Sequence, residues 1–219
     1  MTQEEYFLGF TPARWRAGQA IIGNAARLLG RLHVHGAERL PREGGLVIAV
    51  NHFSWFDPPG VGAAIQRRVY FMAKSEVHRV PGLRQLIRYF GTFSVRRGQS
   101  DRDAVRLMRE VVRRGEALGL FVEGTRQRSG VPGVALPGAA MVALQERVPV
   151  LPVAIRGSFR WKPFQRVDVA FGELLRFDDV PANGKGYKEA TQVIEREIHR
   201  LWDWLGEQPP RGTTPPPRP

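Results

Sequence analysis

Apolar residues follow two alternating patterns along the chain. Short, mostly apolar runs rich in β-branched residues predict buried strands at 45–50, 69–73, 91–95, 118–122, 150–155 and 167–171. Between them, apolar residues recur every three or four positions, which predicts helices over 11–32, 57–66, 81–90, from 100 onward, 137–147 and 187–205. Strands that alternate with helices predict an α/β fold, with a mixed, mostly parallel sheet flanked by helices on both faces.

These elements form one expected domain, residues 1–206. Residues 207–219 are rich in proline, glycine and threonine, and we expect a disordered tail because this composition cannot bury a core. The amphipathic helix over 11–32 has Trp15 and leucines on one face and arginines on the other. The apolar face either covers the sheet or lies in a membrane interface. The basic, aromatic segment 159–164 is a second candidate for lipid contact.

The 219 residues carry a formal net charge of +12, which is nearly all arginine. This charge predicts an anionic partner: a nucleic acid, an anionic bilayer or a phosphorylated substrate. Codon bias in a GC-rich genome is an equally good explanation. The amino terminus lacks the basic-then-apolar order of a secretory signal, and no stretch reaches the length of a spanning helix, so we expect the cytoplasmic side.

The chain has no cysteine, which excludes thiolate nucleophiles and cysteine-rich zinc sites. The five histidines show no His-Glu-x-x-His pattern or other compact set of ligands, and we expect no metal site. These histidines are His33, His35, His52, His78 and His199.

The strongest candidate for chemistry is the segment that follows the strand at 45–50. His52 ends this apolar run, and Asp57 with Pro58 forms a helix-start signal with Asp57 as candidate N-cap. A loop that turns directly into a helix can bring the two side chains together, and a carboxylate beside a histidine orients it as a general base. A capping aspartate with an unrelated surface histidine is the alternative.

The ends of other strands carry charged residues. Lys74 follows the strand at 69–73, Arg97 follows the strand at 91–95, and Glu123, Gly124, Thr125 and Arg126 follow the strand at 118–122. Because sites in such sheets gather at the carboxyl ends of the strands, we expect these residues on the same edge as His52.

Four segments in order resemble the glycerolipid (lysophospholipid) acyltransferases, which include 1-acylglycerol-3-phosphate acyltransferases. Asn51-His52 to Asp57 is similar to their Asn-His-x4-Asp block, and 121–126 to their Phe-Pro-Glu-Gly-Thr-Arg block. Residues 91–97 and 148–153 are similar to the second and fourth blocks, and the resemblance spans about 40–157. Departures that bear on the acceptor are Arg96, Val122, Gln127 and Pro137.

The resemblance implies a glycerol-3-phosphate acyltransferase-like fold and a catalytic pair of His52 and Asp57. It places Arg97 and Arg126 on the acceptor phosphate, which Gly124 and Thr125 would approach through backbone N–H groups. The implied partners are a lysophospholipid acceptor, an acyl thioester donor and an anionic membrane surface. The resemblance further implies acyl-CoA or acyl carrier protein as the donor, no other cofactor, and a peripheral place on the membrane.

Several roles stay open at this point. Asn51 holds the loop or donates to the oxyanion, Glu123 positions Arg126 or a glycerol hydroxyl, and Ser54 is better explained as a turn-stabilising hydroxyl than as a nucleophile. The alternatives in function are another lysolipid or glycolipid as acceptor, or a non-enzymatic basic protein that binds membrane or nucleic acid. The last of these leaves His52 and Asp57 unexplained, and we do not expect nucleic acid as the partner.

Overall fold

A computed structural model describes residues 11–74, 93–95 and 101–218. Its seven-stranded sheet has the order β1-β7-β6-β2-β5-β3-β4. The pair β6 and β7 is antiparallel and every other neighbouring pair is parallel, so the expected mixed, mostly parallel sheet is confirmed. The strands are β1 Leu32–His35, β2 Leu46–Val50, β3 Val69–Lys74, β4 Phe93–Val95, β5 Ala117–Phe121, β6 Val150–Arg156 and β7 Val167–Phe171.

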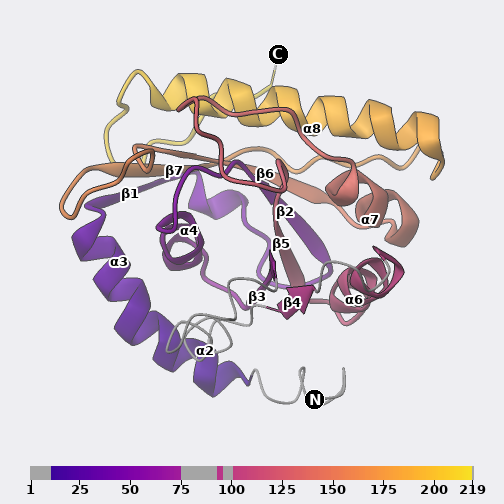
Figure 1. The fold of residues 1–219 in the computed structure, drawn as a ribbon, viewed down its shortest axis with the longest axis horizontal. Coiled ribbons are helices and arrows are strands. Elements are labelled where there is room, and N and C mark those ends of the chain that lie inside the picture. Colours follow the sequence, from indigo (N-terminus) through magenta and orange to yellow (C-terminus); the bar gives the residue numbers. More distant parts are fainter. Residues whose placement is uncertain (1–10, 75–92, 96–100, 219) are drawn as a thin grey trace.

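Helices cover both faces of this sheet (Figure 1). One face packs against α6 Asp101–Arg113, α7 Gly138–Glu146 and α8 Gly184–Leu205. The other face packs against α4 Asp57–Ala64 and the amino-terminal helical segment. Because both faces are covered, all five residues of β2 are buried, as its continuous apolar run predicts, and all five residues of β7 are buried too, including Asp168. The predicted helix over 81–90 lies outside the described residues.

The amino-terminal helix is shorter than predicted and is not uniform. It consists of α2 Pro12–Gly18, the π-helical turn η1 Gln19–Gly23 and α3 Asn24–Leu29. Gly30 ends it, and a Cβ at this position would collide with the ring of Phe56. Leu32, expected at the end of the helix, instead begins β1, a strand that the sequence does not reveal because histidines interrupt its apolar pattern. Pairing with the distant β7 defines this strand.

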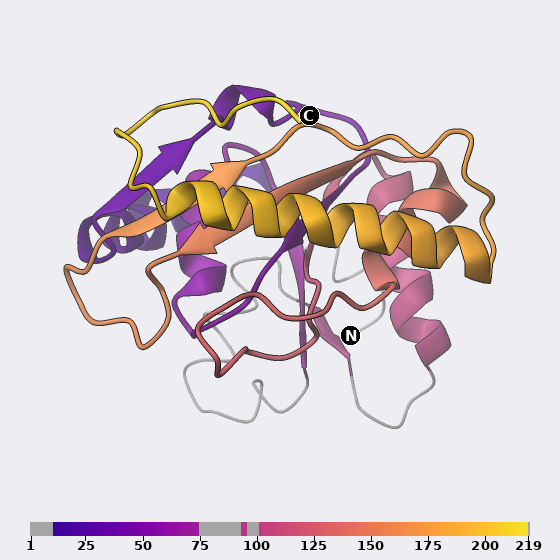
Figure 2. The ribbon, with the colours of Figure 1, turned by 90° about the horizontal axis from the view of Figure 1, so that it is seen from above.

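The carboxyl-terminal segment, for which we expected a disordered tail, contacts the domain through several hydrogen bonds. Figure 2 shows it running back from the end of α8 past β1. The Arg166 guanidinium donates to the carbonyl of Pro209 at 2.8 Å, and that of Arg39 donates to the carbonyl of Pro215 at 2.6 Å. Hydrogen bonds from the domain's arginines to proline carbonyls therefore join this segment to the domain, and Pro209 and Pro215 are themselves buried.

Candidate active site

His52 and Asp57 form a hydrogen-bonded pair at the carboxyl end of β2. Nδ1 of His52 lies 2.7 Å from Oδ2 of Asp57, whose carboxylate is fully buried. The His52 side chain keeps 17% of its surface exposed. With Nδ1 bonded to the carboxylate, Nε2 is the ring nitrogen left to face a substrate. The short loop before α4 thus brings together the two residues that the spacing indicates.

Asp57 is the first residue of α4 and not its N-cap, which is Phe56. Its carboxylate turns back into the loop, where Oδ2 also accepts hydrogen bonds from the backbone N–H groups of Phe53 at 2.5 Å and Ser54 at 2.7 Å. The Ser54 hydroxyl donates to Oδ1 of Asp57 and accepts from the N–H of Phe56, as expected of a turn-stabilising hydroxyl. Several donors converge on one carboxylate, which fixes its position beside His52.

The neighbouring strand β5 and the loop that follows it hold the other side of His52. Its ring stacks on the ring of Phe121, with centroids 4.2 Å apart, and its backbone carbonyl accepts a hydrogen bond from the N–H of Gln127 at 2.8 Å. Phe121 was expected only as part of a motif and not as a contact of the histidine. Stacking on one face and the bond to Asp57 together fix the imidazole plane.

Glu123, expected to position Arg126 or a glycerol hydroxyl, directs its carboxylate at two backbone N–H groups. It is only 6% exposed, and its Oε2 accepts the backbone N–H of His52 at 2.7 Å while Oε1 accepts that of Gly133 at 2.8 Å. Burial raises the pKa of Glu123 to about 7, opposed by these two N–H donors and increased by the nearby charge of Asp57. Glu123 is therefore a positioning residue that joins the loops after β2 and β5.

Asn51, expected among the substrate-binding residues, has both ends of its side-chain amide hydrogen-bonded to Ile155. Its side chain is fully buried, its Nδ2 donates to the carbonyl of Ile155 at 2.9 Å, and its Oδ1 accepts the N–H of Ile155 at 2.8 Å. Both ends of the amide are engaged by β6, so this residue holds the loop, which is one of the two roles the sequence left open.

Arg126 is an exposed residue on the loop that follows β5. Its guanidinium carbon lies 4.4 Å from the ring centroid of Trp55, a cation–π contact with the loop that carries His52. Gly124 has a φ of 65°, and its N–H donates to the carbonyl of Phe121, so this N–H is not directed at an anion as we expected. Thr125 is exposed beside Arg126.

Arg97, the other expected phosphate-binding residue, lies outside the described residues. The strand before it, β4, is parallel to β3, and β3 is parallel to β5. The carboxyl ends of β2, β3, β4 and β5 therefore share one edge of the sheet, as the sequence predicts.

The family model named Acyltransferase matches residues 31–156, which include every candidate site residue. The chain belongs to this acyltransferase family. It is therefore an enzyme, and the non-enzymatic binding protein is set aside as an alternative.

Relatives of this acyltransferase carry a more specific name. The 1-acyl-sn-glycerol-3-phosphate acyltransferase of Bacillus subtilis is 29% identical over 187 residues, 82% of this chain and 92% of that protein. The protein of the same name from Borreliella burgdorferi is 28% identical over 147 residues, 64% of this chain and 53% of that protein.

A solved structure confirms the expected fold. The 1-acyl-sn-glycerophosphate acyltransferase PlsC of Thermotoga maritima superimposes with a TM-score of 0.63 at 24% identity, covering 90% of this chain and 85% of that one.

Proposed function

We propose that this acyltransferase moves a fatty acyl group from an acyl thioester to the free hydroxyl of 1-acylglycerol-3-phosphate, giving phosphatidic acid. The observation that carries the proposal is the hydrogen bond between His52 and the buried carboxylate of Asp57. Relatives named for this reaction support the choice of acceptor. Another lysolipid or a glycolipid is the alternative acceptor.

In the proposed reaction, Nε2 of His52 takes the proton of the acceptor hydroxyl as its oxygen attacks the thioester carbonyl. Asp57 holds the proton on Nδ1 and stabilises the imidazolium that forms. When the tetrahedral intermediate collapses, the carbon–sulfur bond breaks and the proton on Nε2 passes to the leaving thiolate. In these steps the acyl group passes directly from the thioester to the acceptor, and no acyl-enzyme forms. The hydroxyl of Ser54, the candidate nucleophile, is already hydrogen-bonded within the turn.

The acceptor phosphate is assigned to Arg126 together with Arg97. Arg126 is exposed next to the histidine loop, and a guanidinium forms bidentate, charge-assisted hydrogen bonds with phosphate oxygens. Arg126→Ala should raise KM for the acceptor more than it lowers kcat, as measured by steady-state kinetics. A fall in kcat with unchanged KM would remove its binding role.

The acyltransferase is further proposed to bind the cytoplasmic face of an anionic membrane peripherally. Among the described residues, none of the helices is long and apolar enough to cross a bilayer. Ile21 and Leu28 are 69% and 68% exposed on the amino-terminal helix, and Phe164 is 59% exposed on the loop between β6 and β7. The N–H of Phe164 donates to the carbonyl of Leu29 at 2.5 Å, so both candidate lipid-contacting segments belong to one surface.

The reaction is tested by the transfer of labelled acyl groups from acyl-CoA, and separately from acyl carrier protein, to a panel of lysolipids. Native protein should prefer lysophosphatidic acid, and His52→Ala should form no product above background. His199→Ala is the matched control, because this histidine lies on α8 and not on the loop between β2 and α4. Preference for another acceptor would select the alternative, and undiminished transfer by His52→Ala would refute the proposed base.

Membrane binding is tested by co-sedimentation with anionic vesicles. The double variant Ile21→Ser and Leu28→Ser should bind less than native protein because two exposed apolar side chains are lost. Gln192→Ser, at an exposed position of α8, is the control. Equal sedimentation of all three proteins would rule out this surface.

A further inference from the structure

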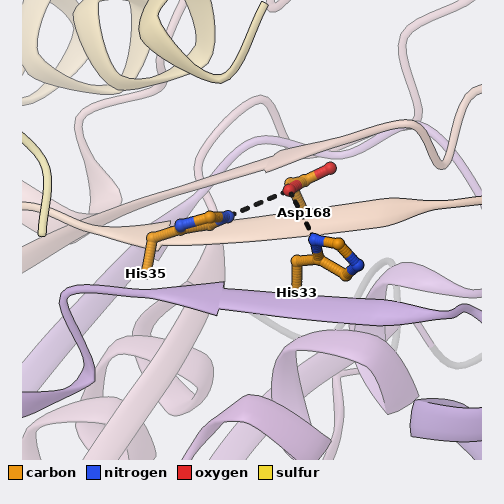
Figure 3. A group of neighbouring side chains, drawn as sticks. All are labelled: His33, His35 and Asp168. Atoms are coloured by element: carbon orange, nitrogen blue, oxygen red, sulfur yellow. Dashed lines mark hydrogen bonds and ion pairs between the residues drawn. The ribbon is translucent and has the colours of Figure 1, made fainter. Parts of the chain in front are cut away.

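A second cluster of ionisable side chains lies on β1 and β7, which are the third and second strands from β2 in the sheet. His33 and His35 lie on β1, and Asp168 lies on β7 directly opposite His33 in the parallel register. Residues two apart on a strand share one face, so both imidazoles lie on the same side of β1. Figure 3 shows both rings directed at the carboxylate of Asp168.

The distances within the cluster suit ligands of one ion. Nε2 of His35 is 2.9 Å and Nδ1 of His33 is 3.8 Å from Oδ1 of Asp168, and all three atoms lie within 4.8 Å of one another. Nδ1 of His33 is buried and has no hydrogen-bond partner in the part of the chain that the structure describes. The 3.8 Å separation is too long for a hydrogen bond but near the spacing of about 3.3 Å between two ligands of a tetrahedral ion.

The cluster is largely shielded from solvent. The His35 side chain is fully buried, and that of Asp168 is 8% exposed.

Arg166 orients the carboxylate. Its Nε donates to Oδ2 of Asp168 at 2.7 Å and its Nη2 to Oδ1 at 2.8 Å. Such outer hydrogen bonds are typical of metal ligands that are carboxylates. The guanidinium also cancels the negative charge of the cluster, which limits affinity for a cation. The His33 side chain is 24% exposed and leaves a route from solvent.

We propose that His33, His35 and Asp168 bind one divalent transition-metal ion of the zinc class, with water in the remaining position. Two imidazoles and one carboxylate suit Zn²⁺, Co²⁺ or Ni²⁺ better than Mg²⁺ or Ca²⁺, which prefer oxygen ligands. The bound ion joins β1 to β7 near the carboxyl-terminal segment, so its effect is on stability and not on acyl transfer. The sequence does not reveal this site, because the third ligand, Asp168, lies 135 positions after His33 and reaches it only through the pairing of β1 with β7.

The test uses the full chain without a histidine tag, treated with a chelator and then titrated with Zn²⁺, Co²⁺ or Mg²⁺. Visible absorption of bound Co²⁺ reports ligand number and geometry, and thermal unfolding reports the gain in stability. His33→Gln removes one ligand at a partly exposed position, and Asp168→Asn removes another. His199→Gln and His52→Gln are the matched controls, since each removes a histidine outside the cluster.

Native protein and both control variants should bind one Co²⁺ or Zn²⁺ and gain thermal stability, with no gain from Mg²⁺. His33→Gln and Asp168→Asn should bind at least tenfold more weakly. If Asp168→Asn does not fold, the comparison of metal binding by native protein and by His33→Gln tests the proposal. Binding of equal strength in native protein and His33→Gln, or no Co²⁺ or Zn²⁺ binding by native protein, would overturn the proposal. These readouts do not depend on acyltransferase activity.

Discussion

Replacing Glu123 by glutamine keeps the shape of a buried side chain and removes its charge. In the native protein each carboxylate oxygen accepts one backbone N–H, from His52 and from Gly133. A glutamine offers only one acceptor oxygen, so its NH₂ group must face one of these two N–H donors. A buried donor left without a partner costs roughly 1–3 kcal/mol of folding free energy.

The pH dependence of this cost follows from the pKa of Glu123. Mainly because of burial, it is raised from its ordinary 4.5 to about 7 in the folded protein. The folded state therefore holds the proton more tightly than the unfolded state, and the stability from this group is present below pH 4.5 and is lost as pH rises to 7 and beyond. The full difference is about 3 kcal/mol, of which about 2 kcal/mol falls between pH 5.5 and 8.5.

The variant Glu123→Gln has no ionisable group at this position, so its stability does not change with this pKa. At pH 5.5 the variant should be less stable than native protein, and by pH 8.5 the deficit should shrink by about 2 kcal/mol, so that the two proteins are nearly equal. Urea unfolding of both proteins across this range measures the difference, in which the contributions of all other groups cancel. Glu207→Gln removes a surface carboxylate as the control. A stability difference for Glu123→Gln that stays constant with pH would refute the reasoning.

Three further predictions concern the loop that carries His52. Asp57→Asn should lower kcat by roughly 10²–10⁴-fold with little change in KM, because the amide cannot stabilise the imidazolium; a loss below tenfold in steady-state assays would contradict this. Asn51→Ala should lower the free energy of unfolding by roughly 2–4 kcal/mol, since it leaves the buried N–H and carbonyl of Ile155 unpaired; urea unfolding close to that of native protein would disprove it. Ser54→Ala should retain acyl transfer, and its complete loss in a folded variant would restore the nucleophile hypothesis.

The sequence by itself determined the α/β class, the carboxyl-end location of the site and the pairing of His52 with Asp57. These features are local. A run of β-branched residues predicts a buried strand wherever it occurs, and a loop turning into α4 can bring together side chains five positions apart. Because these strands are parallel, the charged residues that follow them lie on one edge of the sheet.

Tertiary structure decided the roles of Asn51 and Glu123, the existence of β1 and the position of the carboxyl-terminal segment. Asn51 is hydrogen-bonded to Ile155, 104 positions away, and Glu123 to His52, 71 positions away. Sequence spacing does not predict contacts between residues so far apart. Both residues are polar and lie beside His52, the proposed base, so their side-chain chemistry fits contact with a substrate as well as support of the loop. Only the packing of β5 and β6 against β2 shows that their hydrogen bonds are already used within the protein.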